Sequence, residues 1–220
     1  MELTHAALWL NEFFSDFDGA LLGACHSLAE SAGTVVTPIA KAITFIGEKG
    51  ILMLFIAVVL ICFRKARPAG VCMFGSVCCG ALITNLILKD LVARPRPFNN
   101  VVMPYYGYWL SVGSPAEDGF SFPSGHVTAA AAGVTALALV VKNRKVLWAY
   151  VYVALMCVSR CYLMAHYPSD VLAALIVGVF SAFAAFAVTK LIFVFSEKHK
   201  NNRFFGFVLN FDISEALCKK

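Results

Sequence analysis

Residues Ser169–Phe195 read SDVLAALIVGVFSAFAAFAVTKLIFVF, and only Asp170 and Lys190 among them carry a charge. An α-helix needs about 20 predominantly apolar residues to cross the hydrocarbon core of a bilayer. This stretch therefore predicts a membrane-spanning helix. Four further apolar runs have helical length and a similar composition: Gly50–Phe63, Ala69–Leu88, His126–Val141 and Val146–Met164.

The composition of the whole chain agrees with a membrane protein. Of its 220 residues 60% are hydrophobic and 14% are charged, and the mean hydropathy is +0.77. Runs of helical length favour a helical bundle over a lipid-facing barrel. We therefore expect an all-α, polytopic membrane bundle of about six helices, formed by residues 1–220 as a single domain.

The N-terminal region is the least regular part of the pattern. Residues Phe17–Ile46 mix apolar side chains with polar ones, and Gly33 divides the stretch in two. We expect residues 1–46 to form amphipathic helices, one of which crosses the membrane or lies at its surface. The bundle has six helices in the first case and five in the second.

Basic clusters between the apolar runs predict the orientation. If every run crosses, three clusters lie on one face, and the positive-inside rule makes that face cytoplasmic: Arg64, Lys65 and Arg67; Lys142, Arg144 and Lys145; and Lys198, Lys200 and Arg203. The tail 197–220 is then cytoplasmic and the segment 89–125 is an extracytoplasmic loop. A basic residue at the end of an apolar run is a topology signal, so the net charge of +5 predicts no nucleic-acid partner.

The segment Lys89–Pro97, KDLVARPRP, places cations on the outer face, against the positive-inside bias. Lys89 ends a membrane run, and the neighbouring prolines hold Arg96 on a stiff, extended backbone. A guanidinium offers a planar fork of donors to phosphate oxygens, and Lys adds a point charge. The alternative is that both side chains anchor the helix at the membrane boundary.

The tetrapeptide Pro123–His126, PSGH, has the form of a turn that leads into a helix. Ser124 is a good N-cap, Gly125 allows a ligand to come close, and free backbone N–H groups at a helix start attract anions. His126 would then stand in the first turn, beside the anion. The alternative is an ordinary N-cap with an incidental histidine.

The third motif, Ser159–Asp170, SRCYLMAHYPSD, is the most specific. Arg160 closes one apolar run, His166 falls in the turn, and Pro168 starts the next helix with Asp170 in its first turn. A carboxylate four residues from a histidine can accept the proton of one ring nitrogen and leave the other nitrogen free to act as a nucleophile or base. Alternatively, Asp170 only complements the helix dipole.

Together the three motifs resemble the signature of the type 2 phosphatidic acid phosphatase family, the lipid phosphate phosphatases. That signature is Lys, six residues, Arg-Pro; then Pro-Ser-Gly-His; then Ser-Arg, five residues, His, three residues, Asp. Every fixed position is matched here, by Lys89, Arg96-Pro97, Pro123-Ser124-Gly125-His126, Ser159-Arg160, His166 and Asp170. The match says little about the N-terminal third of the chain.

The resemblance implies a role for each matched residue. His166 would attack phosphorus and form a phosphohistidine, with Asp170 holding its ring. His126 would protonate the leaving oxygen and later activate water. The phosphate-binding residues would be Lys89, Arg96, Ser124, Gly125 and Arg160.

The expected substrate is a lipid phosphate or diphosphate that enters sideways from the outer leaflet of a bacterial-type plasma membrane. Undecaprenyl diphosphate is the first candidate, and phosphatidylglycerophosphate and phosphatidic acid are close seconds. We expect no metal or cofactor, because the cations can stabilise the phosphate charge and the eight cysteines form no C-x-x-C pair. Besides membrane lipids, no obligatory protein partner is inferred.

Two other readings compete with this one. A lipid-binding or transport protein would need only the cations, so the histidines argue against it. A vanadate-dependent haloperoxidase would have a similar site but is soluble, which this apolar composition disfavours.

Overall fold

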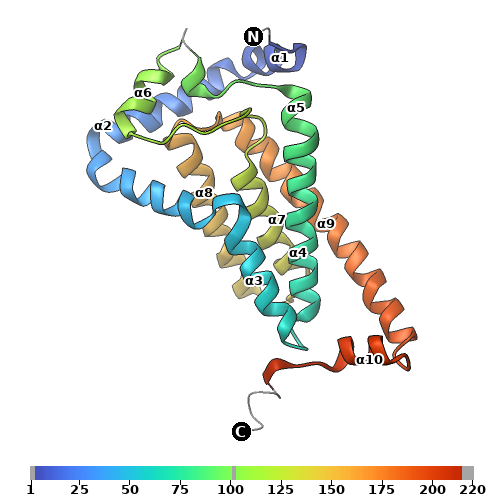
Figure 1. Cartoon of the computed structure of the whole chain (residues 1–220). Helices are drawn as coiled ribbons and strands as arrows, with labels where there is room; N and C mark the ends of the chain where they lie inside the picture. The colour runs from blue at the N-terminus through green and yellow to red at the C-terminus, as the bar shows by residue number, and fades with distance from the viewer. Residues whose placement is uncertain (1–2, 101–102, 215–220) are drawn as a thin grey trace.

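The computed structural model describes residues 3–100 and 103–214, and over these ranges all regular structure is helical. Five helices follow the five predicted apolar runs, so the expected helical bundle is confirmed (Figure 1). They are α3 (Ile51–Cys62), α4 (Arg67–Leu82), α7 (Gly125–Val140), α8 (Tyr150–Tyr162) and α9 (Pro168–Lys198). Three stretches are long and apolar enough to cross a bilayer, Ser15–Cys62, Arg67–Asn99 and Pro168–Lys198, and Gly125–Val140 is a shorter apolar helix. The chain is an integral membrane protein.

Helix α7 forms the centre of the bundle and packs against α4, α8 and α9 (Figure 1). Residues Val127–Ala136 on this helix are all buried, and most are small. Small side chains let neighbouring helix backbones come close, which is how apolar helices associate where no hydrophobic driving force acts between them. The close packing fixes the start of α7, at Gly125, relative to the neighbouring helices.

The contact between α7 and α9 depends on Gly178. A Cβ atom at this position would lie 2.7 Å from Ala131 Cβ and 2.8 Å from the Thr128 carbonyl oxygen, which belongs to the backbone. Gly178→Ala is expected to destabilise the protein by about 1–3 kcal/mol through overpacking, measured as a lower thermal unfolding midpoint in detergent. Gly75→Ala is the matched control, because its Cβ would make an ordinary 3.6 Å contact with Ala185 Cβ. Equal midpoints for the two variants would refute this account.

The N-terminal region contains the predicted pair of helices as the two halves of α2 (Ser15–Ile46), which meet at a kink. A further short helix, α1 (His5–Phe13), precedes them. The predicted break is present as a bend, because Ala32 has non-helical backbone angles beside Gly33. The helix bends around the upper part of the bundle (Figure 1), and its second half packs against α8.

The segment 89–125, which the sequence predicts to be a loop, contains helices. The helix of α4 continues through a π-helical stretch, η2 (Ile83–Leu88), into α5 (Lys89–Val92), so Lys89 lies within a continuous helix. Two 3₁₀ segments occur elsewhere near this end of the bundle, η1 (Glu48–Gly50) and η3 (Pro97–Asn99), and a helix, α6 (Tyr105–Val112), follows. π-Helical turns frequently occur at functional sites. Residues 101–102 lie outside the described ranges.

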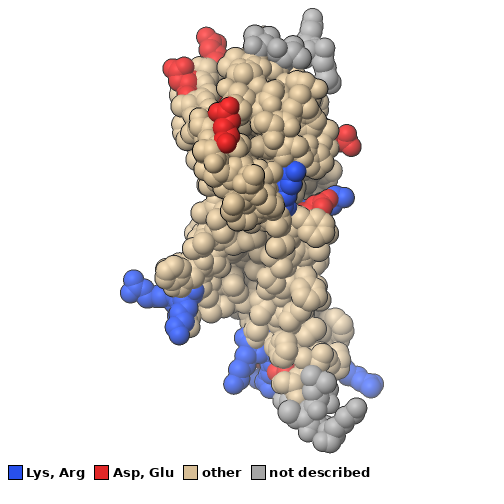
Figure 2. All heavy atoms as spheres, turned by 90° about the vertical axis from the view of Figure 1, so that its left-hand side faces the viewer, with Lys and Arg blue, Asp and Glu red and all other residues tan. Residues whose placement is uncertain are grey.

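The three basic clusters lie at one end of the bundle, as predicted. They occupy the α3–α4 connection, the α7–α8 connection with its 3₁₀ segment η4 (Arg144–Ala149), and the end of α9, all at the base of Figure 1. On the face that Figure 2 shows, Lys and Arg dominate the lower end, and Asp and Glu dominate the upper end. The tail forms α10 (Arg203–Asn210) at the lower end, and its residues 215–220 lie outside the described ranges.

Candidate active site

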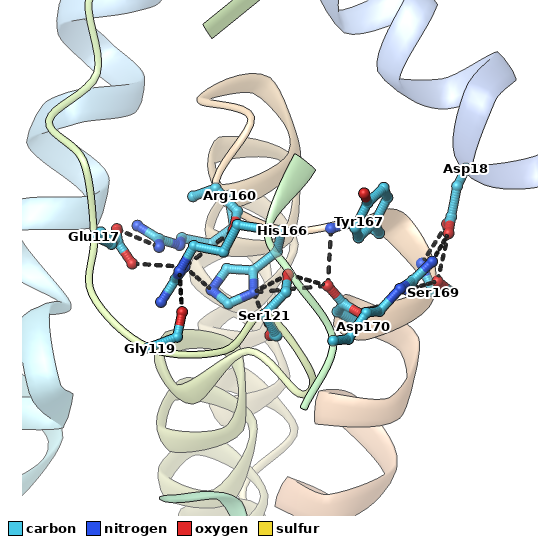
Figure 3. A network of polar contacts seen from close by, with 12 residues as sticks. Asp18, Glu117, Gly119, Ser121, Arg160, His166, Tyr167, Ser169 and Asp170 are labelled. Carbon is cyan, nitrogen blue, oxygen red and sulfur yellow. Dashed lines mark hydrogen bonds and ion pairs between the residues drawn. The ribbon is translucent and has the colours of Figure 1, made fainter. Parts of the chain in front are cut away.

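His166 lies at the centre of a network of polar contacts (Figure 3). It lies in the turn between α8 and α9, where it is only 1% exposed to solvent. Its Nδ1 atom lies 2.7 Å from the Ser121 carbonyl oxygen. Because a carbonyl oxygen can only accept, Nδ1 carries the ring proton and Nε2 carries the lone pair.

The Nε2 atom of His166 faces the guanidinium of Arg96, with 3.3 Å between Nε2 and Nη1. Burial and the nearby charges of Arg160 and Arg96 lower the pKa of His166 well below its ordinary value. The ring is therefore neutral at neutral pH, which is the form that can act as a nucleophile.

Asp170 does not accept the His166 proton directly, in contrast to the predicted geometry. Its Oδ2 atom lies 3.9 Å from His166 Nδ1, beyond hydrogen-bond distance. The Ser121 hydroxyl donates to this same oxygen at 2.5 Å, and the Tyr167 N–H donates to it at 3.0 Å. Asp170 thus orients Ser121, and Ser121 orients the histidine.

The other oxygen of Asp170 belongs to a buried ion network. Arg94 Nη1 lies 2.7 Å from Asp170 Oδ1, and Arg94 Nη2 lies 2.8 Å from Asp18 Oδ2 on helix α2. The Ser169 backbone N–H and hydroxyl both donate to Asp18, at 2.8 and 2.7 Å. Figure 3 shows these contacts between Asp18 on α2 and the first turn of α9. Helix α2 therefore helps to hold the catalytic candidate Asp170.

Two of the predicted phosphate-binding arginines, Arg96 and Arg160, meet at a carboxylate. Arg96 Nη1 lies 3.0 Å from Glu117 Oε2, and Arg160 Nη2 contacts Glu117 Oε1. Burial alone would raise the pKa of Glu117, but the charges of Arg160 and Arg96 lower it to about 2. The carboxylate is therefore ionised at any pH at which the protein is expected to work.

A cavity of about 750 Å³ opens beside these groups. It is lined by six of the eight residues that the motifs predicted, Lys89, Arg96, Gly125, His126, Arg160 and His166. Ser124 lies at the start of α7 and Asp170 lies behind His166. The three motifs, far apart in sequence, thus come together in one place.

Several buried polar atoms at this site lack a hydrogen-bond partner among the described residues. They are His126 Nε2, Ser124 Oγ and two nitrogens of Arg160, Nε and Nη1. Ser124 precedes α7 at the N-cap position, but its hydroxyl makes no capping bond. Unpaired buried polar groups are costly unless a ligand satisfies them. The arrangement is suited to an anion with several acceptor oxygens.

The sequence motifs did not identify four residues that the structure adds to the site. Glu117 and Ser121 lie between the first two motifs, Arg94 lies inside the first, and Asp18 lies in the N-terminal region. For Arg94, the sequence offered one signal of a functional role, its positive charge on the predicted outer face. For Asp18 the sequence offered none, because its partners Arg94 and Ser169 are 76 and 151 positions away in the sequence. In the part of the chain that the structure describes, no group of three or more His, Cys, Asp or Glu could hold a metal ion.

The profile of the PAP2 superfamily matches residues 69–193, which is more than half of the chain and includes all three motifs. Two curated relatives are both undecaprenyl-diphosphatases. The Bacillus subtilis protein BcrC is 31% identical over 112 residues, which cover 50% of this chain and 53% of the relative. The protein of Sulfolobus acidocaldarius is 28% identical over 130 residues, which cover 58% of this chain and 59% of the relative. The match thus spans somewhat more than half the length of each relative.

A solved structure has the same fold. The crystal structure of a transmembrane PAP2 type phosphatidylglycerolphosphate phosphatase from Bacillus subtilis superimposes with a TM-score of 0.56. The alignment covers 86% of this chain and 98% of that one, with 22% sequence identity. The superfamily match and the shared fold agree with the resemblance that the motifs carry, and the chain belongs to the PAP2 superfamily.

Proposed function

We propose that the protein is a membrane phosphatase that hydrolyses a lipid phosphate or diphosphate through a phosphohistidine intermediate. The observation that carries this proposal is the neutral His166, whose Nε2 lone pair faces Arg96. It lies beside a cavity where buried nitrogens of Arg160 and His126 have no hydrogen-bond partner among the described residues. Binding alone would not require a histidine held in one tautomer. That argues against a protein that only binds or transports lipid phosphates.

In the first step, His166 Nε2 attacks phosphorus. The N–P bond forms while the bond between phosphorus and the leaving oxygen breaks, and His126 Nε2 donates a proton to that oxygen. Burial and the cations Arg160, Arg96 and Lys89 favour the neutral His126 ring before substrate binds, so His126 carries this proton only once the negatively charged substrate has bound. The cations Lys89, Arg96 and Arg160 stabilise the charge that develops on the phosphoryl oxygens. The Ser124 hydroxyl and the Gly125 N–H are further donors at the same place.

In the second step, water enters in place of the leaving group. His126, now neutral, takes a proton from the water as its oxygen attacks phosphorus, and the N–P bond breaks. The electron pair returns to His166 Nε2, His126 is protonated again, and inorganic phosphate leaves. The Ser121 carbonyl keeps the His166 proton on Nδ1 throughout.

Undecaprenyl diphosphate is the substrate that the relatives favour, since both are named for it. The leaving group would then be the lipid monophosphate. Phosphatidylglycerophosphate, for which the structural neighbour is named, and phosphatidic acid are the alternatives. The cavity is also lined by Phe45, Val77 and Ala81, which suit the first carbons of a lipid chain. The substrate would enter sideways, as the sequence predicted.

The outer face of a plasma membrane is the proposed location of the active site. The site lies at the end of the bundle opposite the three basic clusters (Figure 1), and the positive-inside rule makes the basic end cytoplasmic. The C-terminal tail follows α9 at that basic end. A reagent that labels cysteines from one side of sealed vesicles would test this orientation.

Purified protein in detergent is expected to release inorganic phosphate from a lipid phosphate in the presence of excess chelator. The panel comprises undecaprenyl diphosphate, phosphatidylglycerophosphate and phosphatidic acid, compared by kcat/KM from a phosphate-release assay. We expect the diphosphate to give the highest value. No release from any of the three would contradict the proposed function, and dependence on an added divalent cation would contradict the metal-independent chemistry.

A further inference from the structure

Glu117 pairs with two of the cations that the proposed mechanism assigns to the substrate phosphoryl group. Its two carboxylate oxygens contact Arg96 Nη1 and Arg160 Nη2, the donors that face the cavity. The two arginine side chains are almost completely buried, with exposures of 3% for Arg96 and 1% for Arg160. Two buried like charges are costly without an anion between them. Glu117 supplies that anion.

Arg96 does not depend on Glu117 for its position. Its Nε atom donates to the Gly119 carbonyl at 3.2 Å, and Nη2 donates to the Asp118 carbonyl at 3.0 Å. A third bond runs from Nη1 to the Ala165 carbonyl at 3.0 Å. These backbone acceptors would keep the guanidinium in place after the carboxylate had left.

The Glu117 side chain can be displaced without unfolding a helix. The segment 114–118 has no regular secondary structure, so no helical hydrogen bond has to break when the side chain swings away. The side chain is 27% exposed and lines the cavity. Its contacts with the two arginines are the polar contacts that a displacement would have to replace.

We propose that Glu117 is a placeholder for the phosphoryl group and sets the selectivity of the site for dianions. This inference rests on the proposed function. The Glu117 carboxylate offers one negative charge and two oxygens. A monoanion that displaces it would make no stronger interaction with the two arginines, so its binding is not favoured. A phosphoryl dianion offers two charges and three oxygens. It can also accept from Arg160 Nε and Nη1, which have no hydrogen-bond partner in the described part of the chain. After turnover, the return of Glu117 to the arginines favours release of inorganic phosphate.

Direct binding to the full-length protein in detergent tests the placeholder role without turnover. Glu117→Gln keeps the size of the side chain but removes the competing charge. The variant is expected to bind inorganic phosphate about tenfold more tightly than the wild type, because a charge-assisted contact no longer has to be broken. The affinity of the variant for a monoanion such as acetate should rise by at least the same factor. The ratio of the acetate to the phosphate dissociation constant should therefore not exceed that of the wild type. Isothermal titration calorimetry measures both dissociation constants.

Asp118→Asn is the matched control. It removes one negative charge from the neighbouring position of the same segment and keeps the backbone carbonyl that holds Arg96. If long-range charge alone governs binding, both variants tighten phosphate binding equally, which would overturn the placeholder role. We expect the phosphate dissociation constant of Asp118→Asn to stay within about twofold of the wild-type value, because solvent and salt screen a charge that takes no part in the ion pairs.

Weaker or unchanged phosphate binding by Glu117→Gln would also overturn the inference, because Glu117 would then be a positioning residue that stays beside the bound phosphate. Glu117→Asp separates a folding defect from a binding effect. The carboxylate of Asp is one methylene shorter, so its contacts with the two arginines should be weaker and the phosphate affinity of this variant should fall between those of the wild type and Glu117→Gln. A failure of the proposed function would instead appear as no phosphate release from the lipid panel, whatever the binding constants are.

Discussion

Replacement of His166 by alanine is expected to lower kcat on the preferred lipid phosphate by about 10⁴-fold or more. The reason is that the variant lacks the atom that forms the bond to phosphorus, and loss of a nucleophile removes most of the rate enhancement. Binding should largely persist, because the cations and the Ser124–Gly125 turn are unchanged. Single-turnover phosphate release and calorimetric phosphate binding, measured on the same preparation, check the two parts of this expectation.

A trapping experiment separates the nucleophile from the proton donor. With substrate labelled in the phosphoryl group and an alkaline denaturing quench, the wild type should retain label on the protein and His166→Ala should not. His126→Ala should lower kcat by about 10²–10⁴-fold, the range for a lost general acid–base group, and should still become labelled. His199→Ala is the matched control, since this histidine is exposed at the end of α9, far along the helix from the site. Label on His166→Ala, or normal turnover by it, would exclude His166 as the nucleophile.

The helices of this protein could be predicted from sequence because the membrane imposes a simple rule. A segment in lipid must satisfy its backbone hydrogen bonds internally, so each apolar run becomes a helix. The same rule does not apply at the membrane surface, where water can satisfy backbone hydrogen bonds. There α6 (Tyr105–Val112) forms inside a predicted loop, and α8 starts at Tyr150, after a 3₁₀ segment, although the apolar run begins at Val146.

The site shows the same division between what sequence patterns reveal and what the fold adds. The motifs indicate which side chains are candidates for chemistry, because ionisable residues within or beside membrane helices are costly and are by default read as functional. They do not indicate which groups orient those side chains. The partner of His166 is a backbone carbonyl, at Ser121, and any residue can supply a carbonyl. The spacing of His166 and Asp170 suggested a direct bond, but the Ser121 hydroxyl lies between them.

Glu117 and Asp18 could not be predicted for a different reason. An acidic residue in a surface segment normally stays in water, and sequence alone does not show that these two face buried arginines. In the structure both carboxylates neutralise cations, Glu117 at the cavity and Asp18 behind the catalytic candidates. The difference between them is exposure, because the Glu117 side chain is 27% exposed and that of Asp18 is 3% exposed. One can therefore exchange with a ligand, and the other is a fixed part of the fold.

The fixed network makes Arg94 the residue whose loss should most affect stability. Its guanidinium lies between the buried carboxylates of Asp18 and Asp170, donates to Asn11 Oδ1 at 2.8 Å, and has its Cζ atom 3.9 Å from the centre of the Tyr167 ring. Arg94→Leu would leave two carboxylates close together without a cation, in surroundings that water does not reach. Removing one partner of a buried ion pair costs about 3–5 kcal/mol, so we expect a large fall in the thermal unfolding midpoint and in the yield of folded protein.

The double variant Arg94→Leu/Asp18→Asn distinguishes an electrostatic cost from a packing defect. If the unpaired charges cause the loss, neutralising Asp18 should recover part of the unfolding free energy that Arg94→Leu removes, since one buried carboxylate is then neutral. If lost packing causes it, the second substitution should add to the damage. Arg203→Leu, at an exposed position on α10, is the matched control and should leave the midpoint unchanged. Because Arg94 also contacts Asp170 directly, recovery of stability without recovery of kcat would show that Arg94 positions this candidate catalytic carboxylate as well as stabilising the fold.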